Sequence, residues 1–202
     1  EYRPHYRWQH FLVFLIYPFL SMLILFVGDF LIFRQTKNAG IVDKHPPKEW
    51  IILICSKLYY VALVFVIPLI FSPWSFTQIL LAFISFHLIN GWIIAFVFMP
   101  SHYFPQASYY EHSEKKHEWF EHQMSTTMDL SPGNRLISGV LGGLNLNVAH
   151  HLFPNFCHTH YFEISRIIRE ESLAEDVTYF NLPYSKAIKE HWRFLKELGT
   201  AE

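Results

Sequence analysis

The sequence predicts an all-α integral membrane protein with a hairpin of two spanning helices, an interfacial N-terminal helix and a cytoplasmic helical cap. Its 202 residues are 51% hydrophobic and only 16% charged, whereas a soluble domain carries about 25% charged residues. The apolar residues concentrate before residue 100 and the charged residues after it. Three apolar stretches, residues 11–33, 51–71 and 76–99, are each long enough to cross a bilayer.

The second and third apolar stretches are the predicted hairpin. The four-residue link between them, residues 72–75, contains no basic residue. The link before them, in contrast, carries Arg34, Lys37, Lys44 and Lys48. Since basic residues mark cytoplasmic loops, the first link is predicted to be cytoplasmic and the second to lie outside. The chain from about Pro100 onward is then cytoplasmic.

The first apolar stretch is ambiguous when its residues are considered alone. It is long enough to cross, but Pro18, Ser21 and Asp29 interrupt it. Such a segment can also lie in the membrane interface or re-enter the membrane from one side. Both placements remain open at this point.

Residues 103–202 are predicted to be mostly helical. Their turn signals are the Pro132-Gly133 and Gly142-Gly143 pairs and the proline before the last helical pattern. In chain order we expect a charged helix over 111–122, a turn at Pro132, a short helix over 135–141 that breaks at Gly142, a helix over 161–171, and an amphipathic helix over 184–198 that ends at Gly199.

Charge and cysteine content exclude several function classes. The net charge is −1, from 16 basic and 17 acidic residues, so no broad basic surface for nucleic acid is predicted. The two cysteines, Cys55 and Cys157, suggest neither a disulfide framework nor a thiolate zinc site. We expect both to be reduced structural thiols.

The 13 histidines include one pattern suited to metal binding, Asn147-Val148-Ala149-His150-His151-Leu152-Phe153-Pro154. On a helix Asn147 and His151 lie one turn apart on one face. Adjacent His150 and His151 point about 100° apart and can serve two metals or two sides of one cluster. Neutral imidazole suits iron, zinc or copper. A histidine pair alone is more often a surface accident, but its position after a membrane hairpin favours a metal site.

The other histidines carry weaker signals. His102 follows the third stretch. It either reaches a metal at the membrane surface or is an interfacial histidine without a functional role. His87 lies within that stretch, too far along a helix to share a metal with His102. We expect His87, with Asn90, to hydrogen-bond a neighbouring helix or line a buried channel. His122 and His160 are candidates for supporting the ligands, and His112, His117 and His191 are assigned to solvated stretches.

Residues 142–161 resemble the third histidine box of membrane fatty-acid desaturases, most closely in the acyl-CoA and linoleoyl-CoA (front-end) branch. His102 resembles that branch's histidine at the end of its last membrane helix. Further matching segments are Trp119, His122-Gln123 and Thr126-Thr127 before the box, and Gln9-His10-Phe11 after the second box. The resemblance implies that residues 1–202 are the C-terminal part of a single desaturase domain.

The resemblance implies O₂-dependent desaturation of a fatty acyl chain, bound to CoA or to lipid, at two non-haem iron ions. The C–H bonds of an unactivated alkyl chain offer no acidic proton, so the reaction needs a redox metal rather than acid–base chemistry. The implied partners are the lipid membrane and an electron donor such as cytochrome b5 or ferredoxin. The implied metal ligands are His102, His150, His151 and, directly or through water, Asn147. His122 and His160 are implied as possible supporting residues that orient the ligands.

The sequence departs from the family pattern in two ways. The family's box begins with Gln or His, where this chain has the shorter Asn147. The first two boxes, of H-x-x-x-H and H-x-x-H-H type, do not occur before residue 100. Since the chain also begins with Glu1 rather than Met, we expect a part of a longer enzyme that by itself neither holds two irons nor turns over.

The family arrangement also bears on the first apolar stretch. All three boxes must face one cytoplasmic metal site, so an even number of crossings separates the second from the third. The first stretch is therefore expected at the interface. The alternatives are a related lipid hydroxylase or sphingolipid desaturase, and a non-catalytic membrane remnant, which Asn147 favours. A histidine-ligated haem protein fits less well, because only His87 lies at membrane depth.

Overall fold

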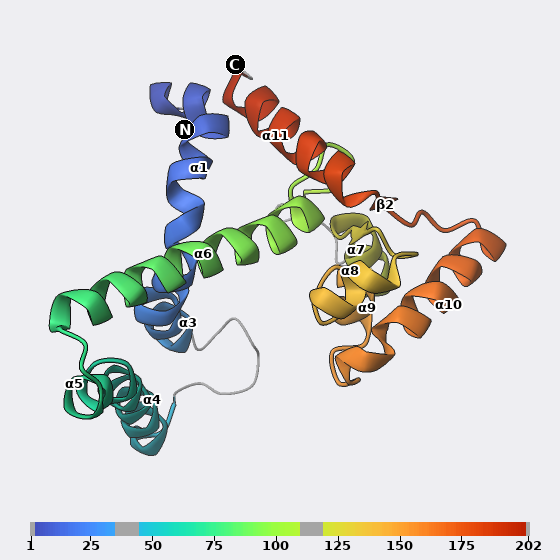
Figure 1. The fold of residues 1–202 in the computed structure, drawn as a ribbon. Helices are drawn as coiled ribbons and strands as arrows, with labels where there is room; N and C mark the ends of the chain where they lie inside the picture. The colour runs from blue at the N-terminus through green and yellow to red at the C-terminus, as the bar shows by residue number, and fades with distance from the viewer. Residues whose placement is uncertain (1–2, 35–44, 110–118, 201–202) are drawn as a thin grey trace. The chain divides into compact units, whose positions relative to one another are not determined.

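The computed structural model describes residues 3–34, 45–109 and 119–200, and almost all of its regular structure is helical (Figure 1). The chain divides into two compact units. The apolar unit comprises Leu15–Ile94, and the box unit comprises Glu1–Phe14 with Ala95–Glu202. The predicted all-α class is confirmed.

The first apolar stretch is one helical run, Pro4–Arg34, long and apolar enough to cross a membrane. Pro18 lies in a short 3-10 turn, as expected of a residue without a backbone donor. The predicted interfacial position of this run stays a prediction. In order, the run consists of η1 (Pro4–Trp8), α1 (Gln9–Ile16), η2 (Tyr17–Phe19), α2 (Leu20–Leu23), the π segment η3 (Ile24–Gly28) and α3 (Asp29–Arg34).

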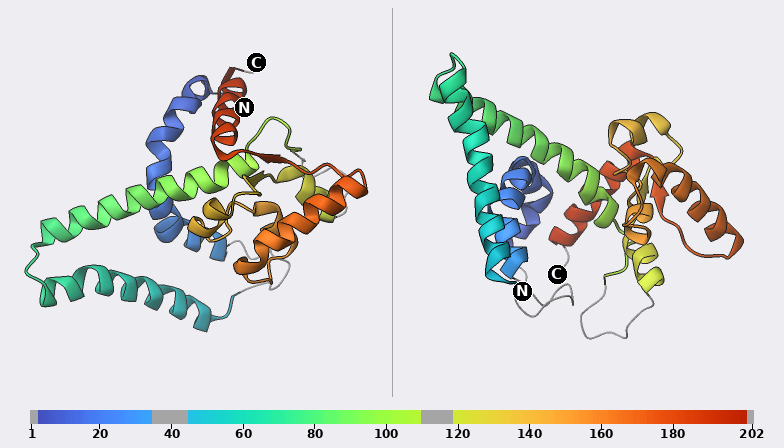
Figure 2. Two further views of the ribbon diagram at one scale, coloured as in Figure 1. Left: turned by 45° about the vertical axis from the view of Figure 1, so that its right-hand side comes forward. Right: turned by 90° about the horizontal axis from the view of Figure 1, so that it is seen from below.

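The second and third stretches form the two arms of the predicted hairpin (Figure 2). The first arm contains α4 (Pro47–Val61), the π segment η4 (Ala62–Val66) and α5 (Ile67–Phe71). Pro68 follows the π segment and explains it, because proline removes one hydrogen bond of the helical ladder. The second arm is α6 (Phe76–His102), which continues three residues beyond the predicted end.

A buried histidine links three helices of the apolar unit. His87 is 2% exposed, and its Nδ1 lies 2.8 Å from Ser21 Oγ. Its Nε2 lies 2.8 Å from the hydroxyl of Tyr60. Asn90 Nδ2 donates to the same Ser21 Oγ over 3.0 Å. The prediction that His87 and Asn90 bond a neighbouring helix is confirmed.

Backbone contact brings the same helices close together. A Cβ on Gly91 would lie 2.0 Å from the carbonyl oxygen of Pro18, so no larger residue fits there without a shift. Asp29 and Lys57 form an ion pair between α3 and α4. The apolar unit is therefore joined by small-residue packing and by internally paired polar groups, as helices in lipid usually are.

The box unit has two hydrophobic cores of buried residues. One includes Leu146, Val148 and Leu152, and the other includes Phe104, Met128 and Leu130. A parallel pair of two-residue strands, β1 (Asp129–Leu130) and β2 (Asn181–Leu182), was not predicted. The helices are α7 (Trp119–Thr126), α8 (Arg135–Val140), α9 (Asn147–Leu152), η5 (His158–His160), α10 (Tyr161–Ala174) and α11 (Tyr184–Thr200).

Most of the predicted boundaries in this unit are close to the observed ones. The chain turns after Leu130, and α8 is followed by Gly142 and Gly143 at φ 59° and 79°, the left-handed region that glycine tolerates. Helix α10 extends three residues beyond its predicted end. Residues 111–118 of the predicted charged helix lie outside the described residues, and α7 begins at Trp119.

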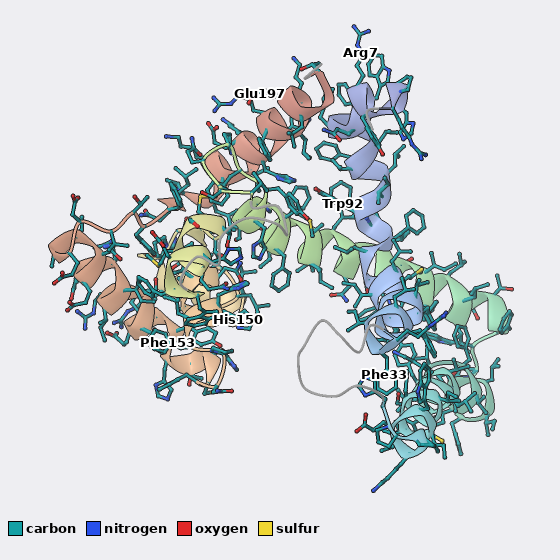
Figure 3. All side chains as sticks on the ribbon, turned by 180° about the vertical axis from the view of Figure 1, so that it is seen from behind. Arg7, Phe33, Trp92, His150, Phe153 and Glu197 are labelled. Atoms are coloured by element: carbon teal, nitrogen blue, oxygen red, sulfur yellow. The ribbon has the colours of Figure 1, made fainter. Side chains whose placement is uncertain are left out.

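The last helix corrects one prediction. Gly199 was expected to end α11, but the helix continues to Thr200. A Cβ on Gly199 would lie 2.3 Å from the carbonyl oxygen of Tyr6, so this glycine permits close contact with the chain's first turns. Gln9 Nε2 also donates to the carbonyl of Leu195 over 2.7 Å. Figure 3 labels Arg7 on η1 and Glu197 on α11, the two elements that meet at this contact.

His191 is a second correction. It was assigned to a solvated stretch, yet it is 3% exposed. Its Nδ1 donates to the carbonyl of Tyr103 over 2.8 Å, and this bond offsets the cost of burying the ring. Lys189 and Arg193 beside it are exposed, on the outer face of an amphipathic helix whose inner face includes the histidine. Cys55 and Cys157 are exposed free thiols.

Candidate metal centre

The box pattern forms a short helix, α9, whose first residue is almost fully buried. Asn147 is 1% exposed, and its Nδ2 donates to His102 Nε2 over 2.8 Å. His102 is the last residue of α6. Two residues that are 45 positions apart therefore meet at the end of a long apolar helix.

His151 joins this pair from the next turn of α9. Its ring centroid lies 5.1 Å from that of His102 and 5.6 Å from that of His150. Its Nδ1 donates to Gln123 Oε1 over 2.8 Å, which leaves Nε2 as the nitrogen with a free lone pair. His150 Nδ1 lies 3.2 Å from the hydroxyl of Tyr161, so its Nε2 is likewise outside that contact.

Burial sets the charge of the box. Burial, together with the smaller effect of the neighbouring His102 and His150 rings, lowers the pKa of His151 to about 4. The imidazole of His151 is therefore neutral at physiological pH. Neutrality is the state that a metal ligand requires, because a protonated ring has no lone pair to offer.

The donor set fits one side of a nitrogen-ligated metal centre. Imidazole suits iron, and outer hydrogen bonds of the kind made by Gln123 fix the ring and tautomer of a ligating histidine. Among residues 3–34, 45–109 and 119–200, no group of three or more His, Cys, Asp or Glu is placed to hold a metal ion.

Two contributors were missed by reasoning from the sequence. The residues that hydrogen-bond the box imidazoles are Gln123 and Tyr161, each directly following a histidine that was chosen for that role. The supporting roles of His122 and His160 stay predictions, and His160 is exposed. The signal for Gln123 was present in the His122-Gln123 match. Adjacent helical residues point in different directions, however, and the sequence does not show which of the two faces the box.

Two hollows adjoin the box within the box unit. One, of about 350 Å³, is lined by His102, Tyr103, Ser108, Tyr109 and Thr126. The other, of about 540 Å³, is almost wholly apolar and begins at Leu152 and Phe153, directly after the histidine pair. Figure 3 labels His150 and Phe153, between which the box changes from polar to apolar.

Comparison with known proteins identifies the family of the chain. The fatty acid desaturase family matches residues 1–183. An acyl-lipid (8-3)-desaturase of Physcomitrium patens is 32% identical over 98% of this chain and 42% of its own length. A sn-1 linoleoyl-lipid 6-desaturase of Arthrospira platensis is 30% identical over 98% of this chain and 55% of its own length. No solved structure matches the chain.

The match covers the box and all three apolar helices, but the chain spans only about half the length of these relatives. With a family match over residues 1–183 and three helices suited to crossing a membrane, the chain belongs to the fatty acid desaturase family and is an integral membrane protein.

Proposed function

We propose that this chain forms the part of a membrane fatty-acyl desaturase that carries the third histidine box, and that it acts within a longer enzyme. The observation that carries the proposal is the meeting of His102, Asn147 and His151 at the end of α6. An imidazole-rich cluster beside a long apolar helix suits oxidative chemistry on a lipid chain. The basic residues before α4 support a cytoplasmic position for this cluster.

The proposed cofactor is a pair of non-haem iron ions, which when bound would supply the O₂-dependent oxidation of an unactivated C–C bond. This chain's own residues prepare the ligands. Gln123 fixes His151 through Nδ1, and Tyr161 contacts His150 in the same way. The proposed ligands are His102, His150 and His151, with Asn147 contributing directly or through water.

The proposed substrate is an acyl chain attached to a lipid. The Physcomitrium and Arthrospira relatives are named for acyl-lipid and linoleoyl-lipid substrates. This favours a lipid-linked chain over a CoA-linked one, the two carriers that the resemblance left open. The electrons are proposed to come from a donor such as cytochrome b5 or ferredoxin, since the reaction consumes electrons that no side chain supplies.

A chimera tests the proposal. The C-terminal part of the Physcomitrium relative is replaced by this chain and expressed in yeast supplied with that relative's fatty-acid substrate. Gas chromatography of the fatty acids is expected to show a new double bond, and iron analysis of the purified chimera is expected to show bound iron. The matched control carries His150→Ala and His151→Ala. Absence of both product and iron from a folded chimera would refute the proposal, and a hydroxylated product would redirect it to the hydroxylase alternative.

A non-catalytic scaffold is the second candidate, and one contact favours it. The amide of Asn147 occupies the Nε2 lone pair of His102, a proposed ligand atom. The variants Asn147→His and Asn147→Gln restore the residues that the family pattern has at this position. If only these variants gain iron and product, the chain as it stands is a scaffold that has lost its site.

A further inference from the structure

The box helix α9 has no side-chain cap of its own. Its N-cap residue is Leu146, whose apolar side chain cannot accept a hydrogen bond from the first backbone N–H groups. Such groups are costly when they are buried without a partner. Asn147, Val148 and Ala149 are all buried, so water does not satisfy the start of this helix.

Asp129 supplies the missing cap from another part of the chain. It is 0% exposed, and its Oδ1 accepts the backbone N–H of Val148 over 2.7 Å. The backbone of Asn147 is a further hydrogen-bond partner of the same carboxylate. A carboxylate at the first turn also interacts favourably with the helix dipole.

The second oxygen of this carboxylate is held from two other segments. Asp129 Oδ2 accepts from Ser165 Oγ on α10 over 2.7 Å and from the hydroxyl of Tyr179 over 2.6 Å. The backbone of Asp129 is fixed in strand β1, where its N–H donates to the carbonyl of Phe180 over 3.0 Å. One side chain therefore ties α9, α10 and the approach to β2 together.

We propose that Asp129 is a positioning residue for the metal site, which it serves by fixing the rotation and register of the box helix. This inference rests on the proposed function. Asn147 and His151 lie on one face of α9, and a slip of one residue would turn that face by about 100° away from His102 and Gln123. Hydrogen bonds at the first turn, locked by two further donors, oppose such a slip.

Two variants of Asp129 separate positioning from simple stability. Asp129→Ala removes every bond of the carboxylate and is expected to lower the iron affinity of the chimera by roughly 10- to 100-fold, the range for residues that orient ligands. Asp129→Asn keeps an oxygen for the Val148 N–H, and the Ser165 and Tyr179 hydroxyls can turn to accept from its amide. This conservative variant is expected to recover most of the affinity.

A matched tyrosine pair gives a milder test. Tyr179→Phe removes one hydroxyl that reaches Asp129, whereas Tyr184→Phe removes a hydroxyl that donates to the carbonyl of Phe96 over 3.2 Å. Only the Tyr179 variant is expected to weaken Fe²⁺ binding, by a few-fold. Equal loss from both variants, or a lower melting temperature with unchanged Fe²⁺ affinity in Asp129→Ala, would overturn the proposal.

Hydrogen exchange on the chain itself supplies a readout independent of iron. The amides of residues 147–152 are expected to exchange faster in Asp129→Ala than in Asp129→Asn, while those of α11 are unchanged. If the parent chimera takes up no iron, the proposed function fails, and this exchange pattern alone then decides whether Asp129 holds α9. Unchanged exchange in residues 147–152 would overturn its positioning role.

Discussion

Each of the two units contains a histidine held by hydrogen bonds, His87 in the apolar unit and His151 in the box unit, and the number of ring nitrogens in use distinguishes them. In the apolar unit both nitrogens of His87 meet a hydroxyl at 2.8 Å, one from Ser21 and one from Tyr60. In the box unit His151 uses Nδ1 for Gln123, which leaves Nε2 for another partner. A histidine whose two nitrogens are both paired acts as a structural link, whereas one with a directed free lone pair can serve as a ligand.

The partners differ in kind as well as in number. Around His87 they are hydroxyl groups, which either donate or accept and so satisfy a neutral ring completely. In the box an amide oxygen of Gln123, which can only accept, fixes His151 in one tautomer, and a single phenol, that of Tyr161, contacts His150. His102 is intermediate, because its Nε2 meets the Asn147 amide, a group that can turn its oxygen toward a metal instead. This comparison predicts opposite outcomes for similar substitutions in the two units.

The largest effect is expected for His151→Ala in the chimera. Removing a ligand should reduce desaturation by more than about 100-fold, beyond the 10- to 100-fold typical of residues that only orient ligands. The thermal unfolding of the apoprotein should change little, because the ring is only partly buried. Product analysis and a melting curve on the same preparation test this, and retained activity would remove His151 from the site.

Gln123→Ala should have the next largest effect. Losing the acceptor for His151 Nδ1 frees the ring to rotate and to change tautomer, so iron affinity should fall by roughly 10-fold. Gln78→Ala is the control, since Gln78 accepts from Ser75 in the exposed link before α6. Iron titration of both variants is the measurement, and equal affinities would show that Gln123 does not orient the ligand.

His87→Phe should affect stability and leave the metal site unchanged. The substitution leaves Ser21 and Tyr60 without their shared partner, at a cost of about 1–2 kcal/mol for hydrogen bonds between membrane helices. Unfolding in mixed micelles should show this loss while iron affinity stays at the parental value. A fall in iron affinity would break the distinction between the two kinds of histidine.

The smallest effect concerns the pH dependence of stability. Burial lowers the pKa of His191, so the folded state favours the neutral ring, while the unfolded chain takes up a proton near pH 6.5. Stability is therefore lost as the pH falls from about 6.5 toward the lowered pKa. His191→Gln keeps a donor for the Tyr103 carbonyl but cannot titrate, and should flatten this part of the curve. If the free energy of unfolding depends on pH equally in both proteins, the titrating group is not His191.

Local patterns predicted the helices and the box because each depends on neighbouring residues. Hydropathy indicated the apolar helices, and the glycine pair marked the break after α8. The sequence also correctly paired His87 with another helix, since an ionisable group at membrane depth requires a partner. It did not identify Ser21 and Tyr60 as those partners, because many hydroxyl residues occur in the apolar stretches.

Several of the missed features depend on segments far apart in the chain. Strands β1 and β2 are two residues long, too short for any periodicity, and they pair across 52 positions, from Asp129 to Asn181. The cap that Asp129 provides to α9, the burial of His191 and the contact of Gly199 with Tyr6 have the same origin. Each is produced by packing that brings distant backbone together, which composition and spacing do not encode locally.

The contact between the chain's first turns and its last helix has a consequence for synthesis. Gln9 hydrogen-bonds Leu195 across 186 positions, and Tyr6 packs on Gly199. The ribosome must therefore release almost the whole chain before residues 3–14 can reach their final partner. During translation that segment lacks its contact with α11, and a stop codon anywhere before α11 removes this contact permanently. The contact therefore couples the final packing of residues 3–14 to the synthesis of α11.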